Sequence, residues 1–271
     1  MDSYGTLSGK TRVIAIIGDP IAQVKSPAGV TRALNARGRD CVVVPIRVTA
    51  ADVDQFIGGA SLAMNLDGII ATVPHKFVSF QHCATVSDRA RFLGAVNILR
   101  RNADGRWHGD MVDGIAFVEA AQAAGCVPAG RRALLIGAGG AGSAIALALL
   151  EAGVAELAIH DQDIGRRDSL LARLKTRYGM KTRAGSSDPS GYTMVINATP
   201  VGMRAEDPYP LQADKLNATM FVGEVITAPA VTPLIEQARR LGCVTQSGGG
   251  MFAANVEVMV DFLLEAGPLA G

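Results

Sequence analysis

The sequence predicts an α/β protein built from two domains, and three observations lead to this prediction. Short β-branched, apolar runs alternate with longer helical stretches from residue 12 to the C-terminal region. The apolar runs are continuous rather than alternating, which is typical of parallel strands covered on both faces. A stretch rich in alanine and glycine, residues 120–132, separates two such series, and 271 residues suffice for two domains of ordinary size.

The first series of elements predicts a domain over residues 1–114. Strands are expected at 12–18, 41–48, 66–73 and 96–101, and helices at 26–38, from about 51, and at 114–125. Pro27 follows Ser26 at the start of the first of these helices, so Ser26 is the expected N-cap.

The second series predicts a Rossmann-type, doubly wound parallel sheet over residues 115–250. Strands are expected at 133–137, 156–160, 194–198, 220–225 and 243–247, and helices from the turn at 137–142 to 153, at 164–178, at 232–242 and at 251–266. Leu170, Leu171 and Leu174 share one face of the helix at 164–178. Thr232 and Pro233 open the next helix, with proline in its first turn.

The composition excludes several classes of protein. Hydrophobic residues make up 49% of the chain and charged residues 19%, which excludes a disordered chain. The 26 basic and 25 acidic residues leave a net charge of +1, so no strong field favours nucleic acid or a membrane surface. We therefore expect a small molecule as the ligand, neither nucleic acid nor membrane as a partner, and a monomer or homodimer.

The cysteines do not indicate a metal site. Cys41, Cys83, Cys126 and Cys243 lie far apart and form no CxxC pair, so no zinc site is expected. The N-terminal dozen residues contain no apolar stretch typical of a signal peptide. These features predict a cytoplasmic protein with reduced, mostly buried thiols.

A charge-free stretch at 133–150 is long enough to suggest a membrane span, but its glycines point to another structure. The sequence Gly137-Ala138-Gly139-Gly140-Ala141-Gly142 follows a predicted strand and opens a predicted helix. Such a turn brings backbone N–H groups and a helix N-terminus to a pyrophosphate. We interpret it as a dinucleotide site; the alternative is a glycine turn that serves only packing.

Asp161 indicates which dinucleotide binds. It stands at the end of the next predicted strand, where an acid accepts hydrogen bonds from ribose hydroxyls and repels a 2′-phosphate. Arg166 and Arg167 come later, in the first turn of the following helix. NAD is therefore preferred over NADP; the alternative for Asp161 is a solvated loop acid.

Several further segments, taken together with the glycine turn, resemble the shikimate dehydrogenase family. They are GDPIAQVKSP (18–27), ATVPHK (71–76), GAVN (94–97), GDMVDG (109–114), NATPVGM (197–203), TPL (232–234) and GGGMFAAN (248–255). They occur in the family's order and span most of the chain.

The resemblance implies an N-terminal substrate domain, a Rossmann domain for the nicotinamide cofactor, and a last helix, 251–271, that packs back on the first domain. Lys76 and Asp113 match the family's catalytic lysine and aspartate, which would share proton transfer with the substrate oxygen. Without the resemblance, Lys76 reads as a surface lysine at a helix start. His75 has no catalytic counterpart.

The resemblance also implies the residues that hold the two ligands. Ser26, Thr72 and Asn97 match positions that contact the substrate. The cofactor site comprises Gly137, Ala138, Gly139, Gly140, Ala141, Asp161, Asn197, Thr199, Pro200, Met203, Gly248 and Met251.

Four substrate positions depart from the family pattern. Val24 replaces a serine, Ile70 an asparagine, Thr227 a tyrosine and Asn255 a glutamine. Hydrogen bonds to an ionised ligand contribute about 1.5–3 kcal/mol each, so losing two weakens shikimate binding on the order of a hundredfold. At the cofactor, Asp161 replaces the arginine of the NADP-dependent members, which again favours NAD.

The sequence thus predicts an NAD-dependent oxidoreductase that transfers a hydride between a hydroxylated cyclic carboxylic acid, such as shikimate or quinate, and the nicotinamide. The alternative is a non-catalytic module that senses NAD or a metabolite on the same fold. A different reaction on this fold is a third possibility, because fold does not fix function.

Overall fold

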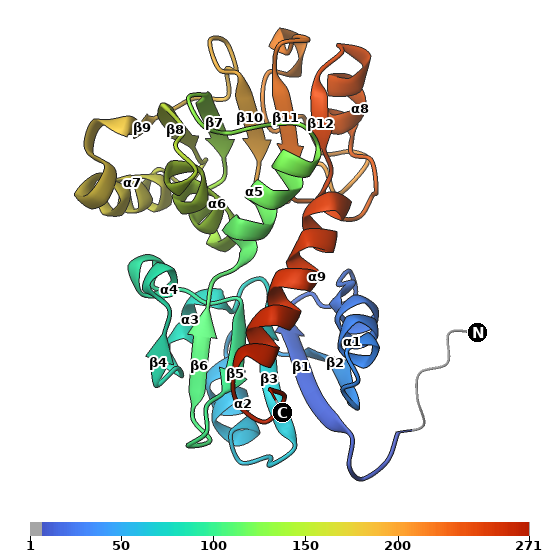
Figure 1. Ribbon diagram of the computed structural model, residues 1–271. Coiled ribbons are helices and arrows are strands. Elements are labelled where there is room, and N and C mark those ends of the chain that lie inside the picture. The colour runs from blue at the N-terminus through green and yellow to red at the C-terminus, as the bar shows by residue number, and fades with distance from the viewer. Residues whose placement is uncertain (1–6, 271) are drawn as a thin grey trace. The chain divides into compact units, whose positions relative to one another are not determined.

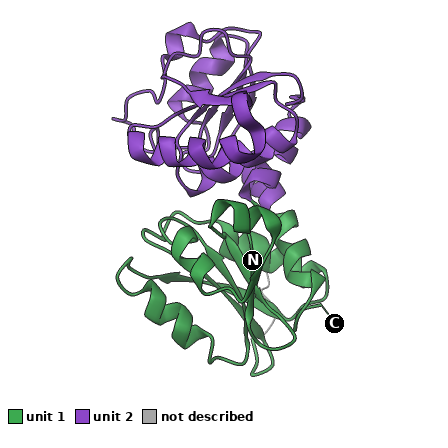
Figure 2. Cartoon of the chain, turned by 90° about the vertical axis from the view of Figure 1, so that its left-hand side faces the viewer, with its two compact units in different colours: residues 1–112, 256–271 green, residues 113–255 purple. Residues whose placement is uncertain are grey.

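The computed structural model describes residues 7–270, which divide into two compact units (Figure 2). Unit 1 holds the described residues up to Val112 and from Val256 onward, and unit 2 is Asp113–Asn255. The division falls two residues before the sequence boundary at 114, which puts Asp113 at the start of unit 2.

Unit 1 contains a six-stranded sheet in the order β2-β1-β3-β5-β6-β4 (Figure 1). Its strands are β1 (Arg12–Gly18), β2 (Cys41–Arg47), β3 (Leu66–Ala71), β4 (Thr85–Val86), β5 (Ile98–Arg101) and β6 (Trp107–Asp110). Its helices are α1 (Ser26–Ala36), α2 (Val53–Ala60), α3 (Lys76–Gln81) and α4 (Asp88–Leu93). The continuous apolar runs do form neighbouring parallel strands, since β1 pairs parallel with both β2 and β3.

The second half of the unit 1 sheet was predicted only in part: the expected strand at 96–101 is β5, whereas β4 and β6 were not expected. β5 pairs antiparallel with both β3 and β6. A short turn connects β5 to β6: Asn102 N donates to Arg106 O at 2.8 Å, and Gly105 has a φ of +77°. A connection this short joins only antiparallel strands.

Helix α1 corrects one prediction. Lys25, not Ser26, is the N-cap, and no side chain caps the helix. Gly29 N donates to Lys25 O at 3.2 Å, so the first helical turn closes one residue earlier than expected and Ser26 is already helical.

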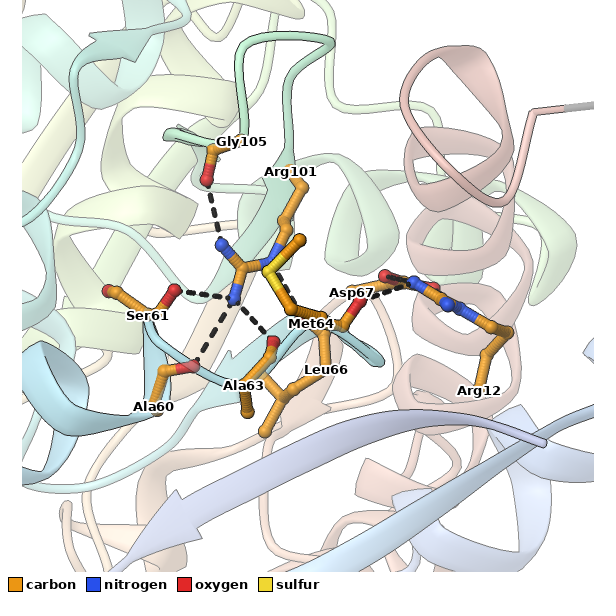
Figure 3. A network of polar contacts seen from close by, with 9 residues as sticks. All are labelled: Arg12, Ala60, Ser61, Ala63, Met64, Leu66, Asp67, Arg101 and Gly105. Carbon is orange, nitrogen blue, oxygen red and sulfur yellow. Dashed lines mark hydrogen bonds and ion pairs between the residues drawn. The ribbon is translucent and has the colours of Figure 1, made fainter. Parts of the chain in front are cut away.

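Arg101 connects separate parts of unit 1 (Figure 3). Its guanidinium donates to Leu66 O and to Gly105 O, both at 2.7 Å. Three more carbonyl oxygens accept from its Nη2, those of Ala60, Ser61 and Ala63 at 3.2, 3.1 and 2.9 Å. The guanidinium also stacks on Trp107, 4.3 Å from the ring centroid. Beside this group, Arg12 pairs with Asp67.

Unit 2 contains a fully parallel sheet in the order β12-β11-β10-β7-β8-β9. Its strands are β7 (Arg132–Ile136), β8 (Glu156–His160), β9 (Thr182–Ala184), β10 (Met194–Asn197), β11 (Phe221–Glu224) and β12 (Val244–Gln246). Its helices are α5 (Asp113–Ala123), α6 (Gly140–Glu151), α7 (Ile164–Tyr178), α8 (Pro233–Arg240) and the first part of α9 (Gly248–Glu265). From β7 the chain adds β8 and β9 on one side and then β10, β11 and β12 on the other, so the strand order reverses between β7 and β10. This is the arrangement of a doubly wound dinucleotide-binding sheet.

Several helices of unit 2 follow the sequence prediction closely. Helix α7 has the predicted bounds, and Leu170, Leu171 and Leu174 are buried. Thr232 is the N-cap of α8, and its hydroxyl accepts from Ile235 N at 3.3 Å. Helix α9 begins three residues before its predicted start at residue 251.

The stretch at 133–150 forms β7, the glycine turn and α6, as predicted. Within residues 7–270, no helix is both long and apolar enough to span a membrane. None of the four cysteines is in a disulfide, and Cys41, Cys126 and Cys243 are buried. The described part of the chain contains no group of three acidic, histidine or cysteine side chains placed to hold a metal ion.

Candidate active site

The glycine turn lies at the point where the strand order of the unit 2 sheet reverses. Gly137 follows β7 with a φ of +106°, and its N–H donates to His160 O at 2.7 Å. A Cβ on Gly137 would lie 2.8 Å from Thr199 Cγ2, and a Cβ on Gly142 would overlap the carbonyl of Gly137. Both positions therefore require glycine, because the turn packs tightly against itself and the segment after β10.

Gly139 is different, because it faces open space. It is the N-cap residue of α6, and a Cβ built on it has no atom within 4 Å. Ser143 Oγ donates to Gly139 O at 2.6 Å, which fixes the first turn of the helix. The turn thus presents bare backbone at a helix N-terminus, the surroundings that a pyrophosphate needs. The residues present fit a dinucleotide.

Asp161 lies directly after β8 and contacts the glycine turn. Its Oδ2 accepts from Ala138 N at 2.7 Å, and its Oδ1 accepts from Asp163 N at 2.8 Å. The carboxylate is thereby held beside the turn, in the loop after β8, where Asp161 is half-exposed. Arg166 and Arg167 pair with acids of their own helix region, Arg166 with Asp163 at 3.3 Å and Arg167 with Asp168 at 2.8 Å.

A turn at residues 197–201 lies against the glycine turn. Asn197, at the end of β10, is fully buried. Its Oδ1 accepts from the N–H and the hydroxyl of Thr199 at 3.1 and 2.7 Å, and its Nδ2 donates to Val201 O at 3.1 Å. Asn197 therefore determines the shape of this turn, which carries Thr199 and Pro200; Met203 follows it and is exposed.

Glu224 ends β11, beside Asn197, and was not among the site residues expected from the sequence. Its side chain is buried and accepts from Asn197 Nδ2, from the N–H groups of Val225 and Ile226, and from the hydroxyl of Thr232. Burial raises the pKa of Glu224 to about 7, although these four donors act in the opposite direction. The criterion that found Asp161, an acid at the end of a predicted strand, also applies to Glu224.

Lys76 is the first residue of α3 and is buried, at 8% exposure, so its interpretation as a surface lysine is wrong. Its carbonyl accepts from Val96 N at 3.0 Å. The preceding His75 is also buried, and its Nε2 makes a hydrogen bond of 2.7 Å with Val48 O. His75 therefore has a structural role, since it joins α3 to the segment after β2.

Thr72 and Asn97 lie close to Lys76 in unit 1. Ala71 N donates to Asn97 O at 2.8 Å, and the N–H of Val96, the neighbour of Asn97, donates to the carbonyl of Lys76. Asn97 is buried, and its Oδ1 accepts from Val112 N at 2.8 Å. Thr72 directly follows β3, at the same sheet edge as the end of β1, and a Cβ on Gly18 would overlap its side chain. Thr72, Lys76 and Asn97, three of the predicted site residues, thus lie at one edge of the unit 1 sheet.

Asp113 and Asn255 are brought together in unit 2. Asp113 is the first residue of α5 and is buried. Asn255, in α9, donates from Nδ2 to Asp113 Oδ1 at 3.0 Å. Gly248 and Met251 belong to the first two turns of α9, and a Cβ on Gly248 would overlap the carbonyl of Ile226.

Comparisons with known proteins identify the family. Residues 16–99 match the shikimate dehydrogenase substrate binding domain. The chain is 32% identical over 264 residues to a shikimate dehydrogenase (NADP(+)) from Geobacter metallireducens, covering 93% of this chain and 90% of that protein. The chain belongs to the shikimate dehydrogenase family. It is an oxidoreductase that acts on a CH–OH group with a nicotinamide cofactor as acceptor.

Solved structures of the shikimate dehydrogenase family and its relatives share the fold. The shikimate 5-dehydrogenase from Listeria monocytogenes, in complex with shikimate and NAD, is 26% identical, with a TM-score of 0.86 over 100% of this chain and 98% of that one. A ligand-free 5-ketofructose reductase from a Gluconobacter strain is 28% identical, with a TM-score of 0.83 over 95% of this chain and 94% of that one.

The positions that depart from the shikimate dehydrogenase pattern have different surroundings. Ile70 is a buried residue of β3, paired with Ile16 of β1 and Ile98 of β5. Val24 precedes α1 and is half-buried, and Ser26 is buried in the first turn of that helix. Thr227 follows β11 and is half-buried, in unit 2.

Proposed function

We propose that the protein is an NAD-dependent dehydrogenase that transfers a hydride between a hydroxylated cyclic carboxylic acid, such as shikimate or quinate, and the nicotinamide. The observation that carries the choice of cofactor is the Asp161 carboxylate, fixed against the glycine turn by the Ala138 N–H. Unit 1 is the substrate domain in this proposal, and unit 2 is the cofactor domain.

The preference for NAD over NADP rests on charge. A carboxylate at the position of Asp161 accepts hydrogen bonds from the two ribose hydroxyls and repels a 2′-phosphate. The basic residues that would neutralise such a phosphate, Arg166 and Arg167, are engaged by Asp163 and Asp168. The Geobacter relative is named for NADP, whereas the Listeria structure holds NAD, so the family accommodates both cofactors.

In the proposed mechanism, Lys76 and Asp113 share proton transfer with the substrate hydroxyl. The nicotinamide, when bound, supplies the hydride acceptor. Lys76 Nζ and the Asp113 carboxylate take the hydroxyl proton during oxidation and return it during reduction. Both side chains are buried, which removes water that would compete for this proton. Ser26, Thr72 and Asn97 hold the other polar groups of the substrate.

The substrate pocket differs from that of a shikimate dehydrogenase at Val24, Ile70, Thr227 and Asn255. Two of these changes replace a polar side chain by an apolar one, which removes hydrogen bonds to the substrate. We therefore propose that shikimate itself is a weak substrate and that a related hydroxy acid is turned over faster.

The first test is reduction of NAD and NADP with shikimate, quinate and an uncharged sugar alcohol, in wild type and Lys76→Ala. We expect NAD-linked oxidation, weak on shikimate, with a loss of at least about a hundredfold in kcat for Lys76→Ala. NAD affinity stays unchanged in that variant. Lys10→Ala, which removes an exposed lysine, is the matched control and keeps full activity.

Two outcomes would contradict the proposal. Strong NADP-linked oxidation of shikimate would show that Asp161 does not select NAD. Turnover of the uncharged sugar alcohol alone would assign the protein a substrate nearer to that of the 5-ketofructose reductase, without a carboxylate.

A further inference from the structure

Glu224 is a buried carboxyl group that the proposed mechanism does not use. It is 1% exposed at the end of β11, next to the segment after β10 that carries candidate cofactor residues. A buried acid at the end of a parallel strand costs stability, since burial penalises its charge. Its presence in this place therefore needs a reason beyond packing.

The hydrogen-bond partners of Glu224 are all donors. Oε1 accepts from Val225 N at 2.9 Å, from Ile226 N at 3.1 Å and from Asn197 Nδ2 at 3.1 Å. Oε2 accepts from Thr232 Oγ1 and from Asn197 Nδ2, both at 3.2 Å. The ionised carboxylate accepts a hydrogen bond from every one of these donors. A protonated carboxyl group would have to donate, and only the Thr232 hydroxyl can turn to accept.

The elements packed against β11 carry few charged groups, and α5, whose Phe117 lies against Gly223, carries Asp113 and Glu119. Neither β10 nor β12, the strands next to β11, carries a charged side chain. The charged residues of α8, which packs on β11, are exposed; they are Glu236, Arg239 and Arg240. Asp207, in the loop that follows the 197–201 turn, accepts from Gly202 N and Arg204 N, which lowers its pKa.

Glu224 connects to the glycine turn through Asn197. The Asn197 amide that donates to Glu224 also holds Val201 O, and the other end of the same amide holds Thr199. Thr199 Cγ2 and the Ala198 backbone lie next to Gly137. A change in the hydrogen bonding of Glu224 therefore alters Asn197, and through Asn197 it alters the position of Thr199 beside Gly137.

We propose that Glu224 is a positioning residue, which as a carboxylate holds Asn197 and the 197–201 turn in the conformation that binds the nicotinamide nucleotide. This inference rests on the proposed function, because it requires the nucleotide to bind at the glycine turn. Protonation of Glu224 on Oε2 makes this oxygen a donor to Thr232, so the Asn197 amide keeps only Oε1 as its carboxylate acceptor. Loss of one such hydrogen bond weakens nucleotide affinity about three- to tenfold.

The test is calorimetric titration of the full chain with NAD from about pH 5.5 to about pH 8.5. Wild-type affinity should rise about three- to tenfold across this range, with a midpoint near the pKa of Glu224. Glu224→Gln should bind NAD with the low affinity of protonated wild type at every pH. The titrations measure binding alone, so they do not depend on catalytic activity.

A second pair of variants separates positioning from stability. Thr232→Val removes one donor to the carboxylate, so it should move the midpoint to higher pH, whereas Thr232→Ser keeps the hydroxyl and the midpoint. The valine variant also removes the α8 cap, but loss of a cap shifts no midpoint. This pair carries the test if Glu224→Gln fails to fold.

Each alternative outcome overturns the inference. A pH profile of Glu224→Gln equal to that of wild type would exclude Glu224 as the titrating group. A wild type that does not bind NAD at all would overturn the proposed function with it, so the two failures are distinguishable.

Discussion

The side-chain amide of Asn255 donates a hydrogen bond of 3.0 Å to Asp113 Oδ1. The residue that departs from the family's glutamine is thus in contact with the proposed catalytic carboxylate. Its other amide atom, Oδ1, is buried without a partner among the described residues. Under the proposed function, this acceptor binds a substrate hydroxyl, which would link the departure at Asn255 to the acid–base chemistry.

We expect Asn255→Leu to lower kcat by about tenfold or more, because Asp113 loses a donor that helps to orient it. NAD affinity should stay the same, since the change lies outside the glycine turn. Steady-state kinetics together with NAD titration checks both statements. Asn255→Gln keeps an amide and should retain more activity than the leucine variant; equal losses in both would contradict an orienting role.

Asp161→Ala tests the cofactor choice. Removing the carboxylate takes away hydrogen bonds to the ribose and the repulsion of a 2′-phosphate, so NAD affinity should fall about tenfold or more while NADP affinity does not. Titration with each nucleotide measures the change. Asp214→Asn, at an exposed acid of the same unit, is the control and should leave both affinities unchanged. An unaltered NAD-to-NADP ratio in Asp161→Ala would rule out selection by this residue.

Gly139→Ala should separate binding from folding. A Cβ at this position meets no atom within 4 Å, so the melting temperature should change little. The added methyl would occupy the place of the pyrophosphate, so nucleotide affinity should fall at least about tenfold. Gly58→Ala, equally open but in α2 of unit 1, should leave nucleotide affinity unchanged. If Gly139→Ala binds NAD normally, the pyrophosphate does not lie over this residue.

Glu224 predicts a pH dependence of stability. In the unfolded chain its carboxyl group loses its proton near pH 4.5, and in the folded protein its pKa is about 7. Between these values the folded state binds more protons, so the free energy of unfolding falls as the pH rises, by up to about 3 kcal/mol. Denaturant titrations should show this fall in wild type and its absence in Glu224→Gln. Parallel pH profiles for the two proteins would contradict it.

Sequence reasoning predicted best where the signal is local and periodic. The bounds of α7, its buried leucines and the Thr232 cap follow from spacing within one helix turn or two. The parallel strands of unit 2 follow from continuous apolar runs, and the position of Asp161 follows from the end of β8.

The remaining features depend on contacts that no local pattern encodes. β6 has four residues, too few to show a period, and its antiparallel pairing with β5 depends on a turn. The bond between Asn255 and Asp113 joins residues 142 positions apart. The environment of Glu224 combines a strand end, a neighbouring strand and a helix cap, so its raised pKa is visible only after folding.

The hydrogen bonds of the Arg101 guanidinium limit how short a folded fragment of unit 1 can be. Four of its five carbonyl partners lie between the last residue of α2 and the first residue of β3, and the fifth lies in the turn after β5. The stretch that matches the substrate binding domain, residues 16–99, ends before this arginine. A fragment cut to that match would leave four of those carbonyl oxygens without their donor and lack the hairpin partner of β5. Any excised substrate domain should therefore extend past β6.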